Sequence, residues 1–408
     1  MELTPIDIAH GGEAVARHDG KAHFIAGAMP GERVEGDIVL DKGSWARVEI
    51  NRVLEASPHR VTPACPHFEE CGGCQWQFAD YPTQLEWKRS IVTGQLAHLG
   101  KLPDAPVRET VAVGPPYGYR NRVDFRVFDG KPALFQQKSR HLVPLDVCHL
   151  LHPLLAEVFD SLGPLDGVER LILRAGVTTG ERLAIIEGTV PDQIGEWGCS
   201  VAQRSRHGLT VISGTGEVHE EIAGTRLRVT GGAFFQNNTE GAAALVRLVA
   251  EATDPLPYET LLDAYAGGGL FGATVGRTAG RVVAVETSPL AVADLRHNLK
   301  TAGVEDHRVV RGSFEEEAGN LDEYWDVAVV DPPRVGLGIG GVAAVTAAFP
   351  RVIAYVSCDP ASLARDHRYL VDAGYVLDWA TPVDLFPQTY HVETVAKYIR
   401  AGAAEEKL

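Results

Sequence analysis

Short apolar runs recur along the last third of the chain, from Thr260 onward, and stretches with helical spacing separate them. The runs read TLLDAYA, RVVAVE, RVVRG, DVAVVD and RVIAYVS. Apolar runs of this kind that alternate with helices are typical of parallel strands joined by helical crossovers. The pattern predicts an α/β fold built on a Rossmann-like, doubly wound parallel sheet.

The first part of the chain has a different pattern, in which short β-prone runs are separated by Gly-rich turns. Between Glu2 and about Ala56 the runs read HFIAGAM, RVEGDIVL and SWARVEINRVL, which is typical of a small β-barrel. Mixed strands and loops follow to about Gly231. We therefore expect an N-terminal OB-like barrel, a central α+β domain and a C-terminal α/β domain, over residues 1–56, 57–231 and 232–408.

Two further segments carry expectations of their own. The stretch YPTQLEWKRSIVTGQLAHLG, at about 81–100, is expected to form a helix that packs back onto the C-terminal domain. The final residues AGAAEEKL are expected to be a frayed tail.

Length and cysteine content limit the class of protein. The chain has 408 residues, enough to bury two or three separate cores. It has no apolar run long enough to span a membrane, and its N-terminus has no charged-then-apolar signal pattern. Six cysteines are too few for a secreted disulfide framework. We expect a cytoplasmic monomer without a membrane partner, whose cysteines serve metal binding or chemistry.

The net charge of -16 argues mildly against a nucleic-acid partner, but the charge is unevenly spread. Residues 81–140 hold ten Lys or Arg against five Asp or Glu, a local charge of +5. Within this segment, PYGYRNRVDFRVFDG interleaves arginines with aromatic residues. Such a stretch can bind phosphates while its aromatic faces stack on unpaired bases. The alternative is an amphipathic strand with a solvated basic face.

A glycine loop follows the first predicted strand of the C-terminal domain, in LLDAYAGGGLFGATV. Gly267 and Gly269 allow a tight turn and a close approach of the backbone to a ligand. The letters also fit the G-x-G-x-x-G pattern of nicotinamide dinucleotide sites. However, Asp263 stands at the strand end four residues before the first glycine, which is more typical of S-adenosylmethionine sites. The loop alone does not choose between the two cofactors.

Two later strand ends carry candidate cofactor contacts in either case. Glu286 ends RVVAVE and is placed to accept hydrogen bonds from ribose hydroxyls, and Ser313 follows RVVRG, close to the expected adenine. Asp331 ends the next strand, in DVAVVDPPRVG, and Cys358 ends the one after it, in VIAYVSCDP. Because parallel sheets hold ligands at the carboxyl edge of their strands, these residues are expected at one site.

The other cysteines form a second constellation. Cys65, Cys71 and Cys74 lie in ACPHFEECGGCQWQ with C-x5-C-x2-C spacing, and Cys148 is a distant fourth. Four thiolates suit either a 4Fe-4S cluster or a tetrahedral zinc ion, and spacing alone does not decide between them. Cys199 is left over and is expected to be structural.

Five motifs together resemble one enzyme family. FFQNN, DAYAGGG, VDPPRVG, SCDPASLARD and HVETV occur in the order and spacing of the RNA uracil-5-methyltransferases. The segment HGGEAVARHDGKAHFIAGAMPGERVEGDIV also resembles a TRAM domain, an RNA-binding barrel. The resemblance spans nearly the whole chain. It implies a class I methyltransferase domain that uses S-adenosylmethionine, and it favours the 4Fe-4S cluster over zinc.

The resemblance also implies roles for individual residues. Carbon 5 of uracil is a poor nucleophile until a thiolate adds to carbon 6, and Cys358 matches the family's nucleophile. Glu393 of HVETV matches the base that removes the proton from carbon 5. Gln236 and Asp331 are expected where methyl donor and uracil meet, and Tyr265 is expected to pack on the cofactor.

Two residues depart from the family pattern. Asp359 stands where many relatives have Asn, and its charge would raise the pKa of Cys358 unless a hydrogen-bonding partner compensates. Leu270 stands where relatives often carry a polar side chain, which weakens one expected cofactor contact.

The expected activity is methylation of carbon 5 of a uridine in RNA, with large-subunit (23S) ribosomal RNA as the favoured substrate. A transfer RNA substrate is the first alternative. A nicotinamide-dependent oxidoreductase would leave the Cys358 and Glu393 motifs unexplained. A non-catalytic RNA-binding module would leave Asp331 unexplained as well.

Overall fold

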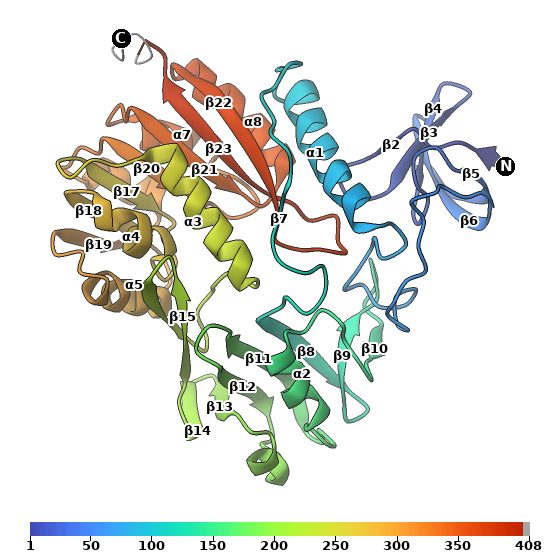
Figure 1. Ribbon diagram of the computed structural model, residues 1–408, viewed down its shortest axis with the longest axis horizontal. Helices are drawn as coiled ribbons and strands as arrows, with labels where there is room; N and C mark the ends of the chain where they lie inside the picture. The colour runs from blue at the N-terminus through green and yellow to red at the C-terminus, as the bar shows by residue number, and fades with distance from the viewer. Residues whose placement is uncertain (403–408) are drawn as a thin grey trace.

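The structure is a computed structural model that describes residues 1–402. The expected C-terminal tail falls mainly on residues 403–408, which lie outside the described residues. Figure 1 shows three groups of elements: blue strands near the N-terminus, green strands at the lower end, and a yellow-to-red layer of strands and helices. No helix within residues 1–402 is both long and apolar enough to cross a membrane.

The N-terminal sheet has six strands in the order β1-β5-β6-β4-β3-β2, so β1 and β2 are its edges. Its core includes Ile25, Val34 and Val48, together with Trp76 and Trp87 from the following segment. The strands are β1 (Glu2–Leu3), β2 (Asp7–Ile8), β3 (Ala14–His18), β4 (Lys21–Ile25), β5 (Arg33–Asp41) and β6 (Trp45–Glu55).

The central sheet has seven strands in the order β10-β9-β8-β11-β12-β13-β14. Helix α2 (Pro153–Asp160) packs against it, and a separate hairpin of β15 (Glu217–Ile222) and β16 (Thr225–Thr230) leads to the C-terminal part. The strands of the sheet are β8 (Arg122–Phe128), β9 (Lys131–Phe135), β10 (Leu142–Pro144), β11 (Val168–Gly176), β12 (Glu181–Gly188), β13 (Ser200–Ser205) and β14 (Gly208–Ser213).

The C-terminal sheet has eight strands in the order β19-β18-β17-β20-β21-β23-β22-β7. The first five in this order are parallel, whereas β23 runs antiparallel between β21 and β22. The strands are β17 (Thr260–Ala264), β18 (Arg281–Glu286), β19 (His307–Arg311), β20 (Val327–Val330), β21 (Val352–Ser357), β22 (Tyr375–Asp384), β23 (Glu393–Arg400) and β7 (Val111–Ala112). The α/β prediction for this part of the chain is confirmed.

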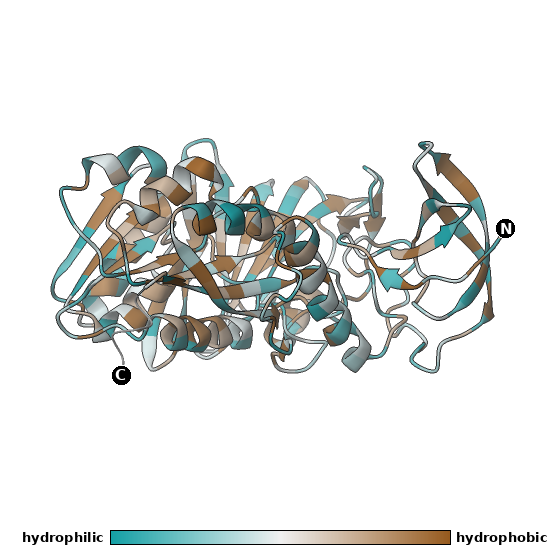
Figure 2. Cartoon of the chain, turned by 90° about the horizontal axis from the view of Figure 1, so that it is seen from above, coloured by the Kyte–Doolittle hydropathy of each residue, from teal (hydrophilic) through white to brown (hydrophobic). Residues whose placement is uncertain are grey.

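Both faces of this sheet are buried, which explains why its strands read as continuous apolar runs. Leu261 and Val282 belong to the core on one face, and their neighbours Leu262 and Val283 belong to the core on the other. Figure 2 shows these brown strands between helices whose outer turns are paler or teal. The helices are α3 (Thr239–Thr253), α4 (Leu270–Thr274), α5 (Pro289–Thr301), α6 (Phe314–Glu317), α7 (Gly338–Thr346) and α8 (Pro360–Asp372).

Two of these helices start with a capping residue followed by proline, at the carboxyl edge of the sheet. Ser288 caps α5 by accepting from the Ala291 N–H, and Asp359 caps α8 by accepting from the Ser362 N–H. A short polar cap satisfies free N–H groups, and proline suits the first helical position because it has no N–H to satisfy. The local sequence therefore fixes where each strand gives way to its helix.

The segment before the central sheet also completes the C-terminal sheet. Helix α1 (Tyr81–His98) packs against α8 and β22, and its Val92 and Leu96 belong to the C-terminal core. Strand β7 pairs in parallel with β22 at the edge of the sheet. Figure 1 shows the cyan α1 beside the red strands.

A buried ion pair joins α1 to the loop that precedes β23. Lys88 donates to Asp384, and both side chains are fully buried. Lys88 also donates to the carbonyl of Phe386 at 3.0 Å. Nearby, Gln84 and Gln388 exchange two hydrogen bonds of 3.0 Å. Helix α1 thus holds the chain from Asp384, the last residue of β22, to Gln388.

Removing Lys88 is expected to destabilise the protein strongly, because it leaves Asp384 buried without a partner. Breaking a buried pair in this way costs roughly 3–5 kcal/mol. Lys88→Ala should therefore lower the thermal midpoint measured by differential scanning fluorimetry. The matched control is Lys131→Ala, which breaks an exposed pair with Asp146 and should leave the midpoint nearly unchanged. Equal midpoints for the two variants would show that the buried pair does not hold α1 in place.

Candidate active site

The glycine loop follows β17, and two acidic side chains accept hydrogen bonds from its backbone. Asp263 is fully buried, and its Oδ2 accepts from the Gly272 N–H at 2.7 Å. Glu286 accepts from the Gly267 N–H at 2.9 Å and from the Ser288 N–H at 2.7 Å. These bonds tie the ends of β17 and β18 together. They place the Glu286 carboxylate against the backbone of the glycine turn.

The backbone of this loop needs glycine at two positions. Gly267 and Gly269 have φ of 54° and 87°, in the left-handed region that glycine adopts readily. A Cβ at Gly269 would also lie 2.7 Å from the Cδ1 of Leu295 on α5. Leu270, which departs from the family pattern, is buried in the core against which the sheet packs. Its apolar side chain therefore serves packing.

Tyr265 and Ser313 meet through an acid that the motifs did not identify. Tyr265 donates to Glu315, and Ser313 donates to the other oxygen of Glu315 at 2.7 Å. The Tyr265 ring also packs edge-on against Phe314, with ring centroids 5.7 Å apart. The only sequence signal for Glu315 was its place directly after the expected adenine residue, in SFEEE.

The antiparallel strand β23 brings Glu393 next to Cys358. Ser357 of β21 pairs with Thr394 of β23, so the next pair at the carboxyl edge of β21 is Cys358 and Glu393. Asp331 directly follows β20, the parallel strand that pairs with β21 on the side opposite β23. The thiol and the two carboxyl groups, far apart in the sequence, thus share one edge of the sheet.

Burial and mutual repulsion set the protonation of these groups. Burial, followed by the negative charge of Asp331, raises the pKa of Glu393 well above its usual range. Burial and the charges of Glu393 and Asp331 raise the pKa of Cys358 to about 12, and Arg334 opposes this rise. Burial and Asp263 raise the pKa of Asp331 to about 7. The site without ligand therefore favours a neutral thiol and a protonated Glu393.

Arg334 was missed, although it lies within the quoted motif VDPPRVG. Its positive charge lowers the pKa of both Cys358 and Glu393. Its guanidinium also lies 3.4 Å from Nδ1 of His391, just before β23. Burial and Arg334 lower the pKa of His391 to about 4, so this imidazole is neutral near pH 7.

Asp359 has the compensating partners that its departure from the family pattern requires. Its Oδ2 lies 3.3 Å from Nε2 of His10, and its Oδ1 accepts from the Ser362 N–H at 2.7 Å. Burial would raise the pKa of Asp359, but the hydrogen bonds from His10 and Ser362 outweigh it and lower the pKa to about 2. His10 opens the segment that resembles a TRAM domain, in the loop between β2 and β3, but nothing in that segment pointed to a contact with Asp359.

Gln236 lies in the loop between β16 and α3 and is almost fully buried. The backbone carbonyl of Gln236 accepts a hydrogen bond of 3.1 Å from the Asn121 side chain. The same Asn121 amide also donates to the Thr239 hydroxyl at 2.9 Å. The loop is thus fixed to the central sheet. Among the described residues, no hydrogen bond joins the Gln236 side chain to Asp331 or Cys358.

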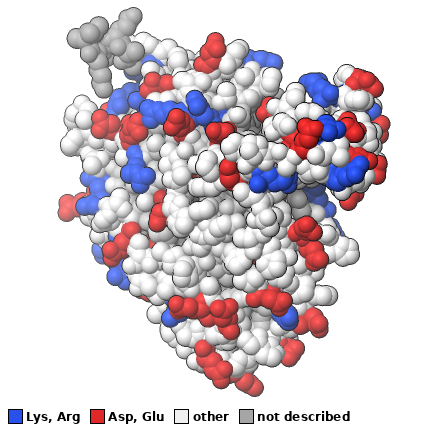
Figure 3. Space-filling model, turned by 45° about the vertical axis from the view of Figure 1, so that its right-hand side comes forward, with Lys and Arg blue, Asp and Glu red and all other residues white. Residues whose placement is uncertain are grey.

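The basic and aromatic segment is mainly an amphipathic strand. Tyr119 and Phe125 are buried in the protein and are not free to stack on bases. Lys88 is buried in its ion pair with Asp384 and cannot reach a phosphate, whereas Arg126 is exposed. In Figure 3, Lys and Arg are interspersed with Asp and Glu, and acidic side chains dominate the lower end of the molecule. The structure thus supports the alternative of an amphipathic strand for most of this segment.

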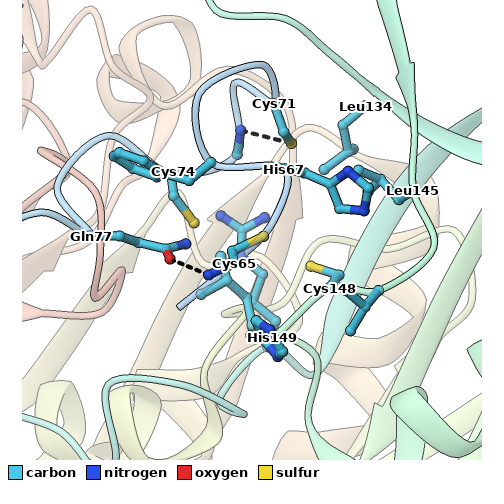
Figure 4. Close-up of a pocket in the computed structure, with 14 residues that line it drawn as sticks. Cys65, His67, Cys71, Cys74, Gln77, Leu134, Leu145, Cys148 and His149 are labelled. Atoms are coloured by element: carbon cyan, nitrogen blue, oxygen red, sulfur yellow. Dashed lines mark hydrogen bonds between the residues drawn. The ribbon is translucent and has the colours of Figure 1, made fainter. Parts of the chain in front are cut away.

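The four cysteines of the second constellation line one pocket beside the central sheet. Cys65, Cys71, Cys74 and Cys148 lie around it with Arg120. Figure 4 shows their sulfur atoms directed into the same space. All are free thiols, and burial raises the pKa of Cys74 to about 12. Within residues 1–402, no group of three or more His, Cys, Asp or Glu side chains is gathered closely enough to hold a metal ion as it stands.

Comparison with known proteins identifies the family. The family model described as tRNA (Uracil-5-)-methyltransferase matches residues 219–399. An uncharacterized RNA methyltransferase of Gloeobacter violaceus is 36% identical, over 97% of this chain and 95% of that protein. Another, from Thermosynechococcus vestitus, is 32% identical over 97% of both chains. The chain belongs to the RNA uracil-5-methyltransferase family.

A solved structure extends the likeness beyond the matched residues. The Pyrococcus abyssi tRNA (uracil-54, C5)-methyltransferase, in complex with S-adenosyl-L-homocysteine, superposes with a TM-score of 0.77 at 25% identity. The superposition covers 98% of this chain and 99% of that one. The likeness of this RNA methyltransferase to that enzyme therefore extends over the N-terminal and central sheets as well as the C-terminal sheet.

The raised pKa of Asp331 predicts how stability depends on pH. The folded protein keeps a proton on this carboxyl up to about pH 7. The unfolded chain releases the proton near 3.8, the ordinary pKa of an aspartate side chain. The stability that this proton supplies is present below pH ~4 and is lost as the pH rises through about 7. Asp331→Asn should therefore raise the thermal midpoint relative to wild type at pH ~8 but not at pH ~4.

The control for this prediction is Glu305→Gln, which removes a charge from an exposed residue in the loop before β19. Thermal midpoints of all three proteins would be measured across the pH range. A constant difference between Asp331→Asn and wild type at every pH would contradict the shifted carboxyl.

Proposed function

We propose that this RNA methyltransferase transfers a methyl group from S-adenosylmethionine to carbon 5 of a uridine, through a covalent bond between Cys358 and carbon 6. The observation that carries the proposal is the register of β21 and β23, which sets Cys358 beside the buried Glu393. A nucleophile and a base at one sheet edge are the two groups that this reaction needs.

The reaction balances with these two groups. The Cys358 thiolate adds to carbon 6, and the electrons of the 5,6 double bond move into an enolate. Carbon 5 then takes the methyl group from the sulfonium, releasing S-adenosylhomocysteine. Glu393, as carboxylate, removes the proton from carbon 5, the double bond re-forms and the thiolate leaves. Arg334 favours the charged form of both side chains, so it assists both steps.

The methyl donor is proposed to lie along the carboxyl edge from β17 to β20. The glycine loop would receive its amino-acid part, Glu286 its ribose, Ser313 its adenine and Tyr265 would pack on it. Gln236 and Asp331 would lie between donor and uracil. The archaeal structure supports this proposal because that enzyme was solved with S-adenosyl-L-homocysteine. If the cofactor were a nicotinamide dinucleotide, hydride transfer would give the pair of Cys358 and Glu393 no chemical role.

The cysteine pocket is proposed to hold a 4Fe-4S cluster, with zinc as the alternative. Its fit rests on the donor set, since four thiols from two distant segments line one pocket. Cys65, Cys71, Cys74 and Cys148 would supply its four thiolate ligands. When bound, the cluster would join the cysteine loop to the central sheet and would not take part in methyl transfer.

The RNA substrate is proposed to be 23S ribosomal RNA, with transfer RNA as the second candidate. The ribosomal assignment rests on the TRAM-like sequence and the four cysteines. Because the archaeal transfer RNA enzyme matches this chain over 98% of its length, the architecture by itself is compatible with both.

RNA with 5-fluorouridine at the target position should be methylated and then remain bound to the protein, because Glu393 cannot remove fluorine as it removes a proton. The assay would use 23S ribosomal RNA fragments and transfer RNA in parallel, and mass spectrometry would locate the crosslink. Cys358→Ser should abolish adduct and turnover. Glu393→Gln should still allow attack and methyl transfer, so a covalent complex should accumulate on ordinary uridine.

The matched control is Cys199→Ser, a half-buried cysteine that packs against the central core. A crosslink at a cysteine other than Cys358, or full turnover by Cys358→Ser, would refute the covalent mechanism. Methylation of transfer RNA alone would assign the second candidate substrate.

Cys71→Ala is expected to remove the cluster and to lower the stability of the central sheet. Anaerobically purified wild type should carry iron and visible absorbance, and the variant should lose both and show a lower thermal midpoint. Cys199→Ala serves again as the control and should keep its iron. Colourless wild-type protein with bound zinc would favour the alternative. A folded Cys71→Ala variant that binds RNA normally but fails only in the chemical step would contradict a structural role.

A further inference from the structure

The loop between β2 and β3 of the N-terminal sheet reaches the active site of the C-terminal sheet. His10 in this loop lies 3.3 Å from Asp359, the residue directly after Cys358. His10 is an exposed residue and Asp359 is half-buried, with side-chain exposed fractions of 33% and 26%. The loop therefore contacts Asp359, the acidic residue that stands where many relatives have Asn.

Neighbouring contacts hold the loop in this position. The Trp76 indole N–H donates to the carbonyl of Gly12 at 3.0 Å. A Cβ at Gly12 would lie 2.7 Å from the Cβ of Tyr390, so the loop packs closely on the segment that leads to Glu393. On its other side, Glu13 pairs with Lys138 at 3.1 Å. These contacts hold the loop at Gly12 and Glu13, two and three residues after His10.

The charges around Cys358 show why a partner for Asp359 matters. Glu393 of β23, Asp331 after β20 and Asp359 itself all disfavour the thiolate, and Arg334 is the cation that opposes them. His391 also lies beside Arg334, but it is neutral because burial lowers its pKa to about 4. A hydrogen-bond donor to Asp359 weakens one of these three repulsions, the one between the Asp359 carboxylate and the Cys358 thiolate.

We propose that His10 is a positioning residue for this active site: it binds the Asp359 carboxylate and so weakens the repulsion between that carboxylate and the Cys358 thiolate. The proposal rests on the proposed function in that it takes Cys358 as the nucleophile. Nε2–H of His10 donates to Oδ2 of Asp359, and the Ser362 N–H occupies Oδ1. The charge at position 359 is thereby held at the start of α8 by two donors.

The test is the rate at which iodoacetamide alkylates Cys358 in the full-length protein, because the thiolate is the reacting form. Mass spectrometry of the peptide that contains Cys358 measures it, and Cys199 in the same digest is the internal control. At pH ~8, His10→Ala should slow alkylation of Cys358 roughly threefold, because the thiolate fraction falls tenfold for each unit that the pKa rises.

Asp359→Asn should speed the alkylation, since it removes the repelling charge. In the Asp359→Asn background, His10→Ala should have no further effect, because its target is gone. His18→Ala, which removes a histidine from an exposed pair in the same sheet, should match wild type. A His10→Ala effect that persisted with Asn at position 359, or the absence of any effect, would overturn the proposal.

The same variants give a second measurement in single-turnover methylation. His10→Ala should shift the rising limb of the pH–rate profile to higher pH, and Asp359→Asn should restore it. A role in folding alone would lower the rate at every pH without moving the limb. Alkylation reports the thiol whether or not it adds to uracil, so failure of the His10 proposal is distinguishable from failure of the covalent mechanism.

Discussion

The active site depends on one topological constraint, the insertion of an antiparallel strand into a parallel sheet. Because β23 runs opposite to β21, its first residue lies at the edge where β21 ends. Glu393 and Cys358 become neighbours only for this reason. A parallel strand at the same place would present its first residue at the far edge. Strand direction, rather than any local motif, thus brings together the cysteine and the glutamate that are proposed as nucleophile and base.

The loop before β23 must then be held in place, and elements from early in the chain do this. Helix α1 binds it through Lys88 and Gln84, and the N-terminal loop packs on Tyr390. The C-terminal sheet also gains its edge strand β7 from the same early segment. The three sheets are therefore tied together around this site, and the central and C-terminal sheets share a core that includes Ile172 and Leu261.

Much of the C-terminal sheet could be predicted from the sequence. Its buried parallel strands are continuous apolar runs, and residues at their carboxyl ends must share an edge, so Glu286, Asp331 and Cys358 were placed together correctly. The likeness of Cys65, Cys71 and Cys74 to a ligand set was also visible from spacing. Strand β23 differs, because nothing in HVETV shows which way the strand that it opens will run.

Contacts between distant segments were beyond prediction. His10 lies in the TRAM-like segment and Asp359 in the motif SCDPASLARD, but neither stretch shows that the two residues meet. The basic segment left two interpretations open for a different reason: alternation of Arg with aromatic residues describes an RNA-binding surface and a half-buried strand equally well. Only the burial of Tyr119 and Phe125 separates the two. Such information comes from packing, and the local sequence does not contain it.

The position of α1 has a consequence for biosynthesis. Lys88 leaves the ribosome 296 residues before its partner Asp384 does. During that interval the helix has no C-terminal sheet to pack on, and Val92 and Leu96 remain exposed to water. Nascent chains generally fold their N-terminal parts first, and exposed apolar faces attract chaperones. The enzyme therefore becomes complete only when its last two strands are synthesised.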